Sequence, residues 1–204
     1  MTSTENPSPV GRPREFDHEA VLSAVIELFW EKGYGATSVG DIVERTGLSK
    51  SSLYGAFGSK DELYRTALDR YLGDQSAHVQ DVLVNGTRGL DDIEAFFGRV
   101  EEQIDVNQQR GCLAVNTATE LHTGEPALVE LGVAHREVMR RGFAAALCRA
   151  AERGEIDRAR IADGANTLVA TAIGLAVMIR GGAPPSELRA HARSATAFLR
   201  TTTG

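Results

Sequence analysis

The apolar residues of this chain recur at spacings of three and four positions, which is the period of an α-helix. The first such stretch begins after Asp17, whose carboxylate can cap a helix, and ends at Gly33. Within it, Val21, Val25 and Leu28 fall on one face. The pattern therefore predicts an amphipathic first helix whose apolar face packs inward.

The helical period continues toward the C-terminus, and no stretch shows the period of two that is typical of a strand. Glycine and proline signals separate the stretches. The further predicted helices begin or run at residues 38–45, 49–57, 60–71, 89–106, 111–123, 125–153, 157–181 and 185–201. We therefore expect an all-α fold of about nine helices, with a three-helix helix-turn-helix domain followed by a larger helical bundle.

Three parts are predicted along the chain. Residues 1–15 are rich in Ser, Thr, Pro and Asn and are expected to form a flexible arm that carries Arg12 and Arg14. Residues 16–62, which we call the head, contain the helix-turn-helix pattern. Residues 63–204, which we call the body, contain the remaining helices.

Composition favours a cytoplasmic protein. The 204 residues include only two cysteines, Cys112 and Cys148, which argues against a secreted disulfide scaffold. No positively charged start leads into an apolar stretch, so no signal peptide is expected. The longest uncharged stretch, between Asp163 and Arg180, is short for a bilayer crossing and favours a buried helix over a membrane partner.

Net charge alone does not indicate nucleic-acid binding. The chain carries a formal charge of −6, and residues 1–70 contain eight bases against eleven acids. Between Arg45 and Lys60, however, there are three bases and no acid. Because local sign decides phosphate contact, this stretch can still face DNA, but the motif has to carry the hypothesis.

That motif spans residues 37–60. It consists of two short patterns that can form capped helices, joined at Gly47, which suits the open or left-handed backbone needed between them. Ile42 and Leu53 can pin the pair onto the first helix. The outward positions of the second helix are all capable of hydrogen bonds to phosphates or base edges: Ser49, Lys50, Ser51, Ser52 and Tyr54.

Residues 16–68 resemble the DNA-binding head of the tetracycline-repressor (TetR) family, mainly through Thr-Gly-Leu-Ser-Lys-Ser-Ser-Leu-Tyr-Gly-Ala-Phe-Gly-Ser-Lys-Asp-Glu-Leu at 46–63 and Gly-Arg-Pro-Arg at 11–14. The resemblance implies a homodimeric transcriptional repressor that binds a near-palindromic double-stranded operator. Its implied phosphate contacts include Tyr54 and Lys60. The implied DNA-contacting residues are Arg12, Arg14, Thr37, Ser38, Ser49, Lys50, Ser51, Ser52, Tyr54 and Lys60.

Two glycines depart from the family pattern. Gly40 stands where many relatives place a basic or polar residue, and Gly55 stands where an aromatic or polar residue is common. The operator sequence therefore cannot be transferred from a relative.

The resemblance also implies that the body forms a ligand cavity and a dimer interface. The segment 168–179 is rich in small and β-branched residues, which suits close helix contact, although a buried helix within one chain would look the same. The predicted dimer contacts are Ala170, Ile173, Val177, Phe198 and Leu199.

An unknown small-molecule effector is expected in the body, where apolar side chains alternate with a few polar ones. The alternative is an ordinary core. The predicted effector-binding residues are Phe97, Cys112, Asn116, Thr119, His135, Met139, Phe143 and Met178.

Cys112 is also a candidate sensor. The segment 111–120 resembles the stretch that opens the sixth helix in a subset of the family, and some members with a cysteine there respond to electrophiles or oxidants. A thiol at a helix N-terminus beside Arg110 is expected to form the reactive thiolate more readily. The alternative is a small buried hydrophobic side chain.

The sequence leaves two other function classes open. An enzyme would need Cys112 with His122 or His135 as a thiol catalyst, or Glu120, His122 and Glu125 as metal ligands, but neither set has the spacing of a known family. We therefore expect no catalysis, no cofactor and no metal. The other class is a helical adaptor that has lost DNA binding.

Overall fold

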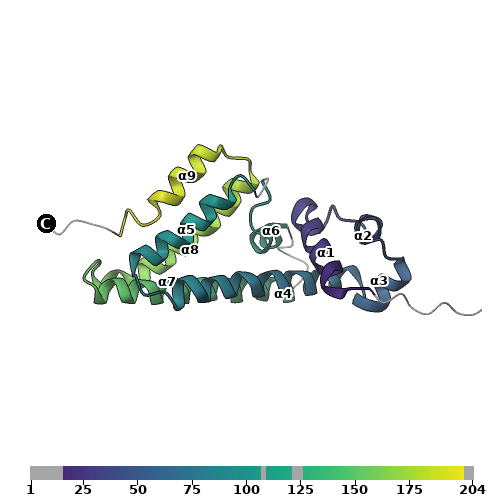
Figure 1. The fold of residues 1–204 in the computed structure, drawn as a ribbon, viewed down its shortest axis with the longest axis horizontal. Coiled ribbons are helices and arrows are strands. Elements are labelled where there is room, and N and C mark those ends of the chain that lie inside the picture. Colours follow the sequence, from purple (N-terminus) through teal and green to yellow (C-terminus); the bar gives the residue numbers. More distant parts are fainter. Residues whose placement is uncertain (1–15, 107–108, 121–125, 200–204) are drawn as a thin grey trace, which may run out of the picture.

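The computed structural model describes residues 16–106, 109–120 and 126–199, and every regular element among them is helical (Figure 1). These residues form nine α-helices, as the sequence predicts. The elements are α1 (His18–Lys32), α2 (Val39–Thr46), α3 (Lys50–Phe57), α4 (Lys60–Val79), the π-helical turn η1 (Gln80–Val84), α5 (Leu90–Gln103), α6 (Leu113–Glu120), α7 (Pro126–Glu152), the 3-10 turn η2 (Arg158–Arg160), α8 (Ile161–Arg180) and α9 (Pro185–Ser194).

Side-chain caps begin each of the first four helices. The Asp17 carboxylate accepts hydrogen bonds from two backbone N–H groups of α1, and Ser38, Ser49 and Ser59 cap α2, α3 and α4. Gly47 ends α2 in the left-handed conformation, with a φ of 69°. These local signals confirm the predicted helix starts and the predicted turn.

The head forms one apolar cluster beneath α1, α2 and α3. It includes Phe29, Ile42 and Leu53, and α4 extends it through Leu63 to Leu72. Leu113 from α6 also belongs to this cluster, so part of the body packs directly on the head. Figure 1 shows α4 running from the head along the body, with α6 beside the head.

A second cluster fills the body. Phe97 and Phe143 lie at its centre, and α7 and α8 pack side by side along their lengths. Three rings contact one another within it: Phe97 and Phe143 stack, and Phe96 meets Phe143 edge to face at a centroid distance of 5.1 Å. The body therefore has its own core, and α4 and α7 each contribute residues to both clusters.

Two features of the body differ from the sequence prediction. The fourth helix continues into the π-helical turn Gln80–Val84, which no sequence signal indicated. The last helix was expected to reach residue 201, but α9 ends at Ser194 and residues 195–199 form turns. Leu199 then packs into the core of its own chain, with 1% of its surface exposed.

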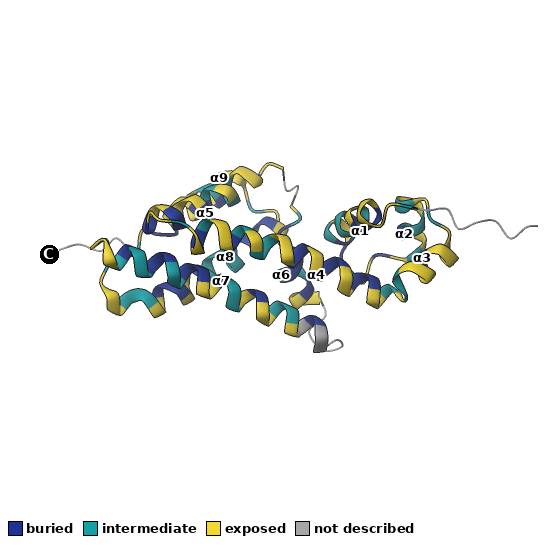
Figure 2. Cartoon of the chain, turned by 60° about the horizontal axis from the view of Figure 1, so that its bottom comes forward, coloured by how far each residue is buried: buried dark blue, intermediate teal, exposed yellow. Residues whose placement is uncertain are grey.

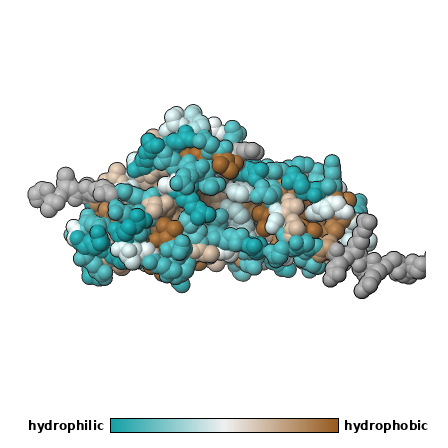
Figure 3. Space-filling view, in the orientation of Figure 1, coloured by the Kyte–Doolittle hydropathy of each residue, from teal (hydrophilic) through white to brown (hydrophobic). Residues whose placement is uncertain are grey.

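The surface drawn in Figure 3 is mostly hydrophilic, with small separate hydrophobic patches. Figure 2 shows exposed and half-buried residues along one side of α7 and α8. Among the described residues, the helix Arg158–Arg180 is long and apolar enough to cross a bilayer by length and composition. Only 33% of its apolar window is buried within the chain.

Candidate nucleic-acid interface

The helix-turn-helix is fixed by contacts at the start of α2. The Ser38 hydroxyl accepts a hydrogen bond from the backbone N–H of Asp41 at 3.1 Å, and the Asp41 carboxylate accepts one from the Ser38 N–H at 2.7 Å. Lys32 donates to the same carboxylate at 2.6 Å. These hydrogen bonds, first from Lys32 and then from Ser38, lower the pKa of Asp41 well below its usual range.

Three serine hydroxyls lie together at the start of α3. The Ser49 Oγ accepts from the Ser52 N–H at 3.1 Å and lies 2.9 Å from the hydroxyls of both Ser51 and Ser52. All three residues are exposed. Hydroxyls can both donate and accept, so this cluster can meet phosphate oxygens and base edges alike.

Lys50 and Tyr54 extend the exposed surface of α3. Tyr54 exposes 48% of its surface, an unusual state for a tyrosine near a packed core, while Leu53 beside it is buried. Lys50 is exposed as well. The structure therefore brings the predicted residues Ser49 to Tyr54 onto one accessible helix.

The head neutralises part of its own positive charge. Lys32 pairs with Asp41, and Arg45 pairs with Glu31 at 2.7 Å. The hydrogen bond between this pair lowers the pKa of Glu31 and raises that of Arg45. Within the described head, the exposed ammonium of Lys50 has no such ion pair, so it is the cation of α3 available to DNA.

Two predicted contact residues point into the head. Thr37 is 1% exposed, and its hydroxyl donates to the Gly33 carbonyl at 2.6 Å. Because that hydroxyl is buried and bonded, Thr37 locks the turn and is not available to DNA in this conformation. The Lys60 ammonium donates to the Tyr34 carbonyl at 2.6 Å and lies 4.1 Å from the Tyr34 ring centre. Its phosphate contact stays a prediction.

The two glycines that depart from the family pattern lie on open surface. A Cβ built at Gly55 meets nothing within 4 Å, and one at Gly40 meets only the Ser38 hydroxyl at 3.4 Å. Neither glycine is therefore required by packing within the head. Arg12 and Arg14, the predicted contacts of the arm, lie outside the described residues.

The predicted effector residues fall into two groups. Phe97, Met139 and Phe143 are buried in the core of the body, and Met178 packs against it. These four form a close-packed core, which is the alternative that the sequence left open.

The second group, Cys112, Asn116 and Thr119, lies just before α6 and along it, beside the head. Cys112 is half-buried, and the Tyr71 hydroxyl donates to its Sγ at 3.6 Å. The Asn116 amide donates to the Arg110 carbonyl at 2.7 Å, while the exposed Thr119 hydroxyl donates back to its own helix. The Asn116 amide and the Thr119 hydroxyl therefore already have hydrogen-bond partners in α6 or just before it.

His135 stands apart from both groups. It is 8% exposed, and its Nδ1 is a buried atom that has no hydrogen-bond partner among the residues that the structure describes. Burial lowers its pKa, so the ring is neutral at pH 7. A buried ring nitrogen without a partner is costly, which makes this the one predicted effector residue with an unmet hydrogen-bonding capacity.

The predicted dimer contacts also divide. Ala170 and Val177 are exposed on α8, and Ile173 is half-buried between them. Phe198 is half-buried against the body core, and the buried Leu199 packs near Leu147 within its own chain.

A hollow of about 290 Å³ lies beside Ala170 of α8, because the neighbouring Val169 is part of its lining. It is open to solvent and none of the predicted effector residues lines it. Its lining residues are Val133, Arg136, Glu137, Arg140, Asn166 and Val169.

Sequence reasoning missed a set of body residues that contact the head. Arg110, Glu120 and Arg180 all bond to α1 or to the turn after it. Their partners lie 79 to 150 positions away in sequence, so no local pattern could indicate them. Within the described residues, no group of three His, Cys, Asp or Glu side chains could hold a metal ion.

Comparison with known proteins covers both parts of the chain. Residues 21–67 match the family model described as bacterial regulatory proteins, tetR family. The HTH-type transcriptional repressor ComR of Escherichia coli (strain K12) is 29% identical over 184 residues, covering 87% of this chain and 86% of ComR. The uncharacterized HTH-type transcriptional regulator YezE of Bacillus subtilis (strain 168) is 30% identical over 149 residues, covering 72% of this chain and 77% of YezE.

Among solved structures, a cysteine-substituted variant of the TetR family transcriptional regulator CifR, in complex with 26-base-pair operator DNA, has a TM-score of 0.77. It is 28% identical in sequence, and the similarity covers 92% of this chain and 98% of the CifR chain. The similarity therefore extends well beyond the helix-turn-helix and through the helices of the body.

Proposed function

Because the chain belongs to the TetR family of bacterial transcriptional regulators, we propose that it is a homodimeric repressor which leaves its operator in response to a small molecule or a thiol modification. Membership of this family confirms the resemblance predicted from residues 46–63. The relatives compared above are all described as transcriptional regulators, which is a non-enzymatic role. The proposed place of action is the cytoplasm.

DNA contact through α3 rests on one observation: an exposed row of hydrogen-bonding side chains on the second helix of a capped helix-turn-helix. Ser49, Ser51 and Ser52 supply hydroxyls, and Lys50 supplies an ammonium without an ion pair. A helix of this kind fits the major groove, where such groups can meet base edges and phosphates.

The test is a gel shift with DNA from the promoter region of the protein's own gene. Binding should weaken steeply as salt rises, because phosphate contacts release counterions. Tyr54→Ala and Lys50→Ala should each weaken binding, whereas Val106→Ala, an exposed valine of the body, should not. Unchanged binding in both head variants would contradict docking through α3.

The proposed dimer seam lies on the outer side of α7 and α8. The apolar stripe of Ala170, Ile173 and Val177 is only partly covered by the residues that the structure describes: Ala170 and Val177 are exposed and Ile173 is half-buried. Val133, 49% exposed, extends the apolar surface onto α7. A second copy related by a two-fold axis would cover this surface with the same surface of its own.

Charge favours a second copy over a lipid surface as the occupant. Arg136, Glu137 and Arg140 line the hollow next to the stripe. Glu137 accepts hydrogen bonds from Arg140 at 2.7 Å, and that contact, with a second from Arg141, lowers the pKa of Glu137 to about 2. Charged groups of both signs suit the polar rim of a protein interface and are costly in a bilayer.

The proposal that a small molecule releases the protein from DNA rests on His135. An effector that hydrogen-bonds its Nδ1 would satisfy a buried atom that lacks a partner in the described part of the chain. Met139, one helical turn beyond His135 on α7, lies in the same core cluster as Phe97 and Phe143, so an effector that reached His135 from that side would have to shift side chains. We therefore expect a mostly apolar compound with one hydrogen-bonding group.

The alternative proposal, release by thiol modification, rests on Cys112, which is half-buried between the start of α6 and Tyr71 of α4. Addition of its thiolate across the activated C=C bond of an electrophile would form an S–C bond and break the C=C π bond, with a proton taken up from water at the other carbon, and would add bulk at this contact. Cys112→Ser should keep DNA binding but abolish release by N-ethylmaleimide, whereas Cys148→Ser should keep both. Release of the Cys112→Ser variant would show that Cys112 is not the trigger.

A further inference from the structure

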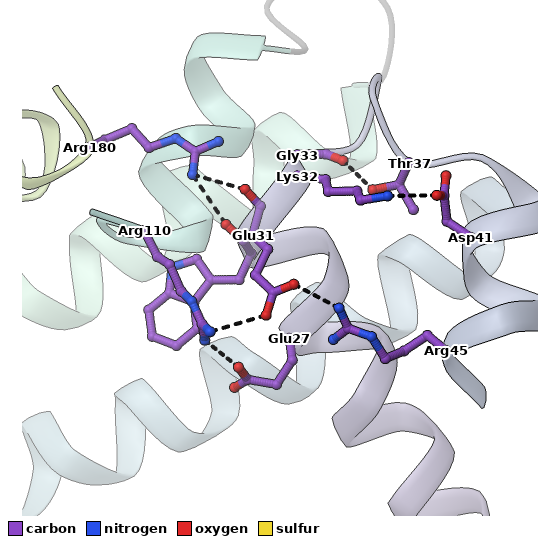
Figure 4. A network of polar contacts seen from close by, with 10 residues as sticks. Glu27, Glu31, Lys32, Gly33, Thr37, Asp41, Arg45, Arg110 and Arg180 are labelled. Atoms are coloured by element: carbon purple, nitrogen blue, oxygen red, sulfur yellow. Dashed lines mark hydrogen bonds and ion pairs between the residues drawn. The ribbon is translucent and has the colours of Figure 1, made fainter. Parts of the chain in front are cut away.

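The segment 110–120 of the body contacts the head at both of its ends. At its beginning, the Arg110 guanidinium forms ion pairs with Glu27 and Glu31 of α1, the latter at 3.1 Å (Figure 4). The guanidinium also lies 5.7 Å from the Trp30 ring centre. With 19% of its side chain exposed, Arg110 is well shielded from solvent, which strengthens such pairs relative to fully exposed ones.

At the other end of the segment, Glu120 grips the turn that follows α1. Its carboxylate accepts hydrogen bonds from the backbone N–H of Tyr34, at 3.1 Å, and of Gly35. A Cβ at Gly33 would come within 2.8 Å of this carboxylate, and one at Gly35 within 2.9 Å. Adjacent N–H groups in a turn form a concave anion site, and here the anion is supplied by the body.

A third contact comes from the end of α8. Arg180 donates to the carbonyls of Trp30 and Glu31 at 3.3 Å each, which are last-turn carbonyls of α1. The Glu31 carboxylate continues to Arg45 on α2, at 2.7 Å. A connected set of polar contacts therefore runs from the body through α1 to the helix-turn-helix, as Figure 4 shows.

These polar contacts restrain the orientation of the head relative to the body. The head joins the body through α4 and through apolar contacts such as that of Leu113, and the polar contacts add a direct link between α6 and α1. Arg110 and Glu120 hold α1 and its following turn, which lie to one side of α4 and lead into α2. The angle at which α3 is presented is thereby tied to the position of α6.

We propose that Arg110 and Glu120 are positioning residues for DNA binding: they touch no DNA, but they set the orientation of each head and so the half-site separation that the dimer selects. This inference rests on the proposed dimeric binding to paired half-sites. Two linked heads gain affinity over one head only where the geometry lets both engage at once.

The experiment compares the wild-type protein with an Arg110→Gln, Glu120→Gln double variant. DNA fragments carry either a single half-site or two half-sites whose separation is changed by one or two base pairs. The wild type should prefer its best separation over a wrong one by on the order of a hundredfold. The variant should bind the single half-site within about twofold of the wild type but discriminate separations by roughly tenfold or less.

Arg193→Gln is the matched control, because it removes an ion pair with Glu101 that lies wholly within the body. It should leave discrimination unchanged. Full discrimination in the double variant would overturn the inference. Weaker binding to the single half-site would overturn it as well, because the contacts would then serve the fold of the head. A wild type without any preference would instead contradict the dimeric binding itself, and the inference would fall with it.

Discussion

The head and the body differ in what defines their helices. Asp17, Ser38 and Ser49 cap the three head helices, and a glycine ends each of them. In the body, α5, α8 and α9 begin without a side-chain cap from the residue before them, and the first N–H of α5, that of Leu90, is instead bonded by the distant Glu155 carboxylate. The helices of the head are thus capped from within a few residues, whereas the body relies more on contacts between distant segments and leaves part of the apolar face of α8 exposed.

The largest expected effect is the loss of a central ring in the body. Phe143 is fully buried against Phe96 and Phe97, so Phe143→Ala should lower the free energy of unfolding by about 3–5 kcal/mol. Urea unfolding followed by circular dichroism measures this, with Val106→Ala as an exposed control. A loss below about 1 kcal/mol would show that the body core is loosely packed.

Next in size is the cost of a charge in the proposed dimer seam. Val177→Arg would place an unpaired cation in an apolar interface, which should weaken dimerisation by about 3 kcal/mol, or more than a hundredfold. Sedimentation at decreasing concentrations measures the dissociation. Val106→Arg places the same charge on another exposed valine and should leave the dimer intact. Equal dimerisation of both variants would move the seam elsewhere.

Two glycine substitutions in the head should have opposite signs. Gly47→Ala forces a Cβ into a left-handed backbone with a φ of 69°, which should cost about 1 kcal/mol even though the site has open space. Gly55→Ala lies in an open helical position and should stabilise by up to about 1 kcal/mol. Thermal unfolding compares the two. The same sign for both would show that caps and turns do not govern the head.

The smallest effect is a pH dependence from His135. Burial lowers its pKa in the folded state, so the unfolded chain binds a proton first as pH falls. Stability from this group is present above the unfolded pKa of about 6.5 and is lost as pH falls below it, by at most about 1.4 kcal/mol per pH unit. Unfolding of wild type and His135→Gln between pH 7 and 5 isolates the effect.

The exposed His191→Gln is the matched control and should follow the wild type. His78 also has its pKa lowered by burial, so both variants retain that contribution and only the difference between them reports on His135. Parallel curves for wild type and His135→Gln would contradict the linkage.

The sequence predicted the head almost residue by residue because its signals are local. Caps such as Ser38 and Ser49 act on N–H groups two or three positions away, and Gly47 acts on its own backbone. Thr37 was misjudged because its exposure depends on the Gly33 carbonyl, which a turn brings back to it. Even in the head, the direction in which the Thr37 side chain points can be known only from the folded turn.

In the body, the sequence predicted helices but not their contacts. The π-helical turn at Gln80–Val84 has no sequence signal, and Arg149 supports it by donating to the Leu83 and Val84 carbonyls from 65 or 66 positions away. The grip of Glu120 on the turn after α1 spans 85 or 86 positions. Such pairings form only when the helical bundle packs together. The sequence therefore indicated which residue types could bind an effector or form a dimer contact, but not where those residues lie in the fold.

Because α4 is long, a small tilt at its body end produces a larger displacement of the end that carries the head. Its 20 residues, Lys60–Val79, extend over about 30 Å at the rise of an α-helix. A tilt of about 5° at the body end would displace the other end by roughly 2.6 Å, which approaches the 3.4 Å step between stacked base pairs. A tilt of this size would move a head that is docked as proposed by most of one base-pair step along the groove.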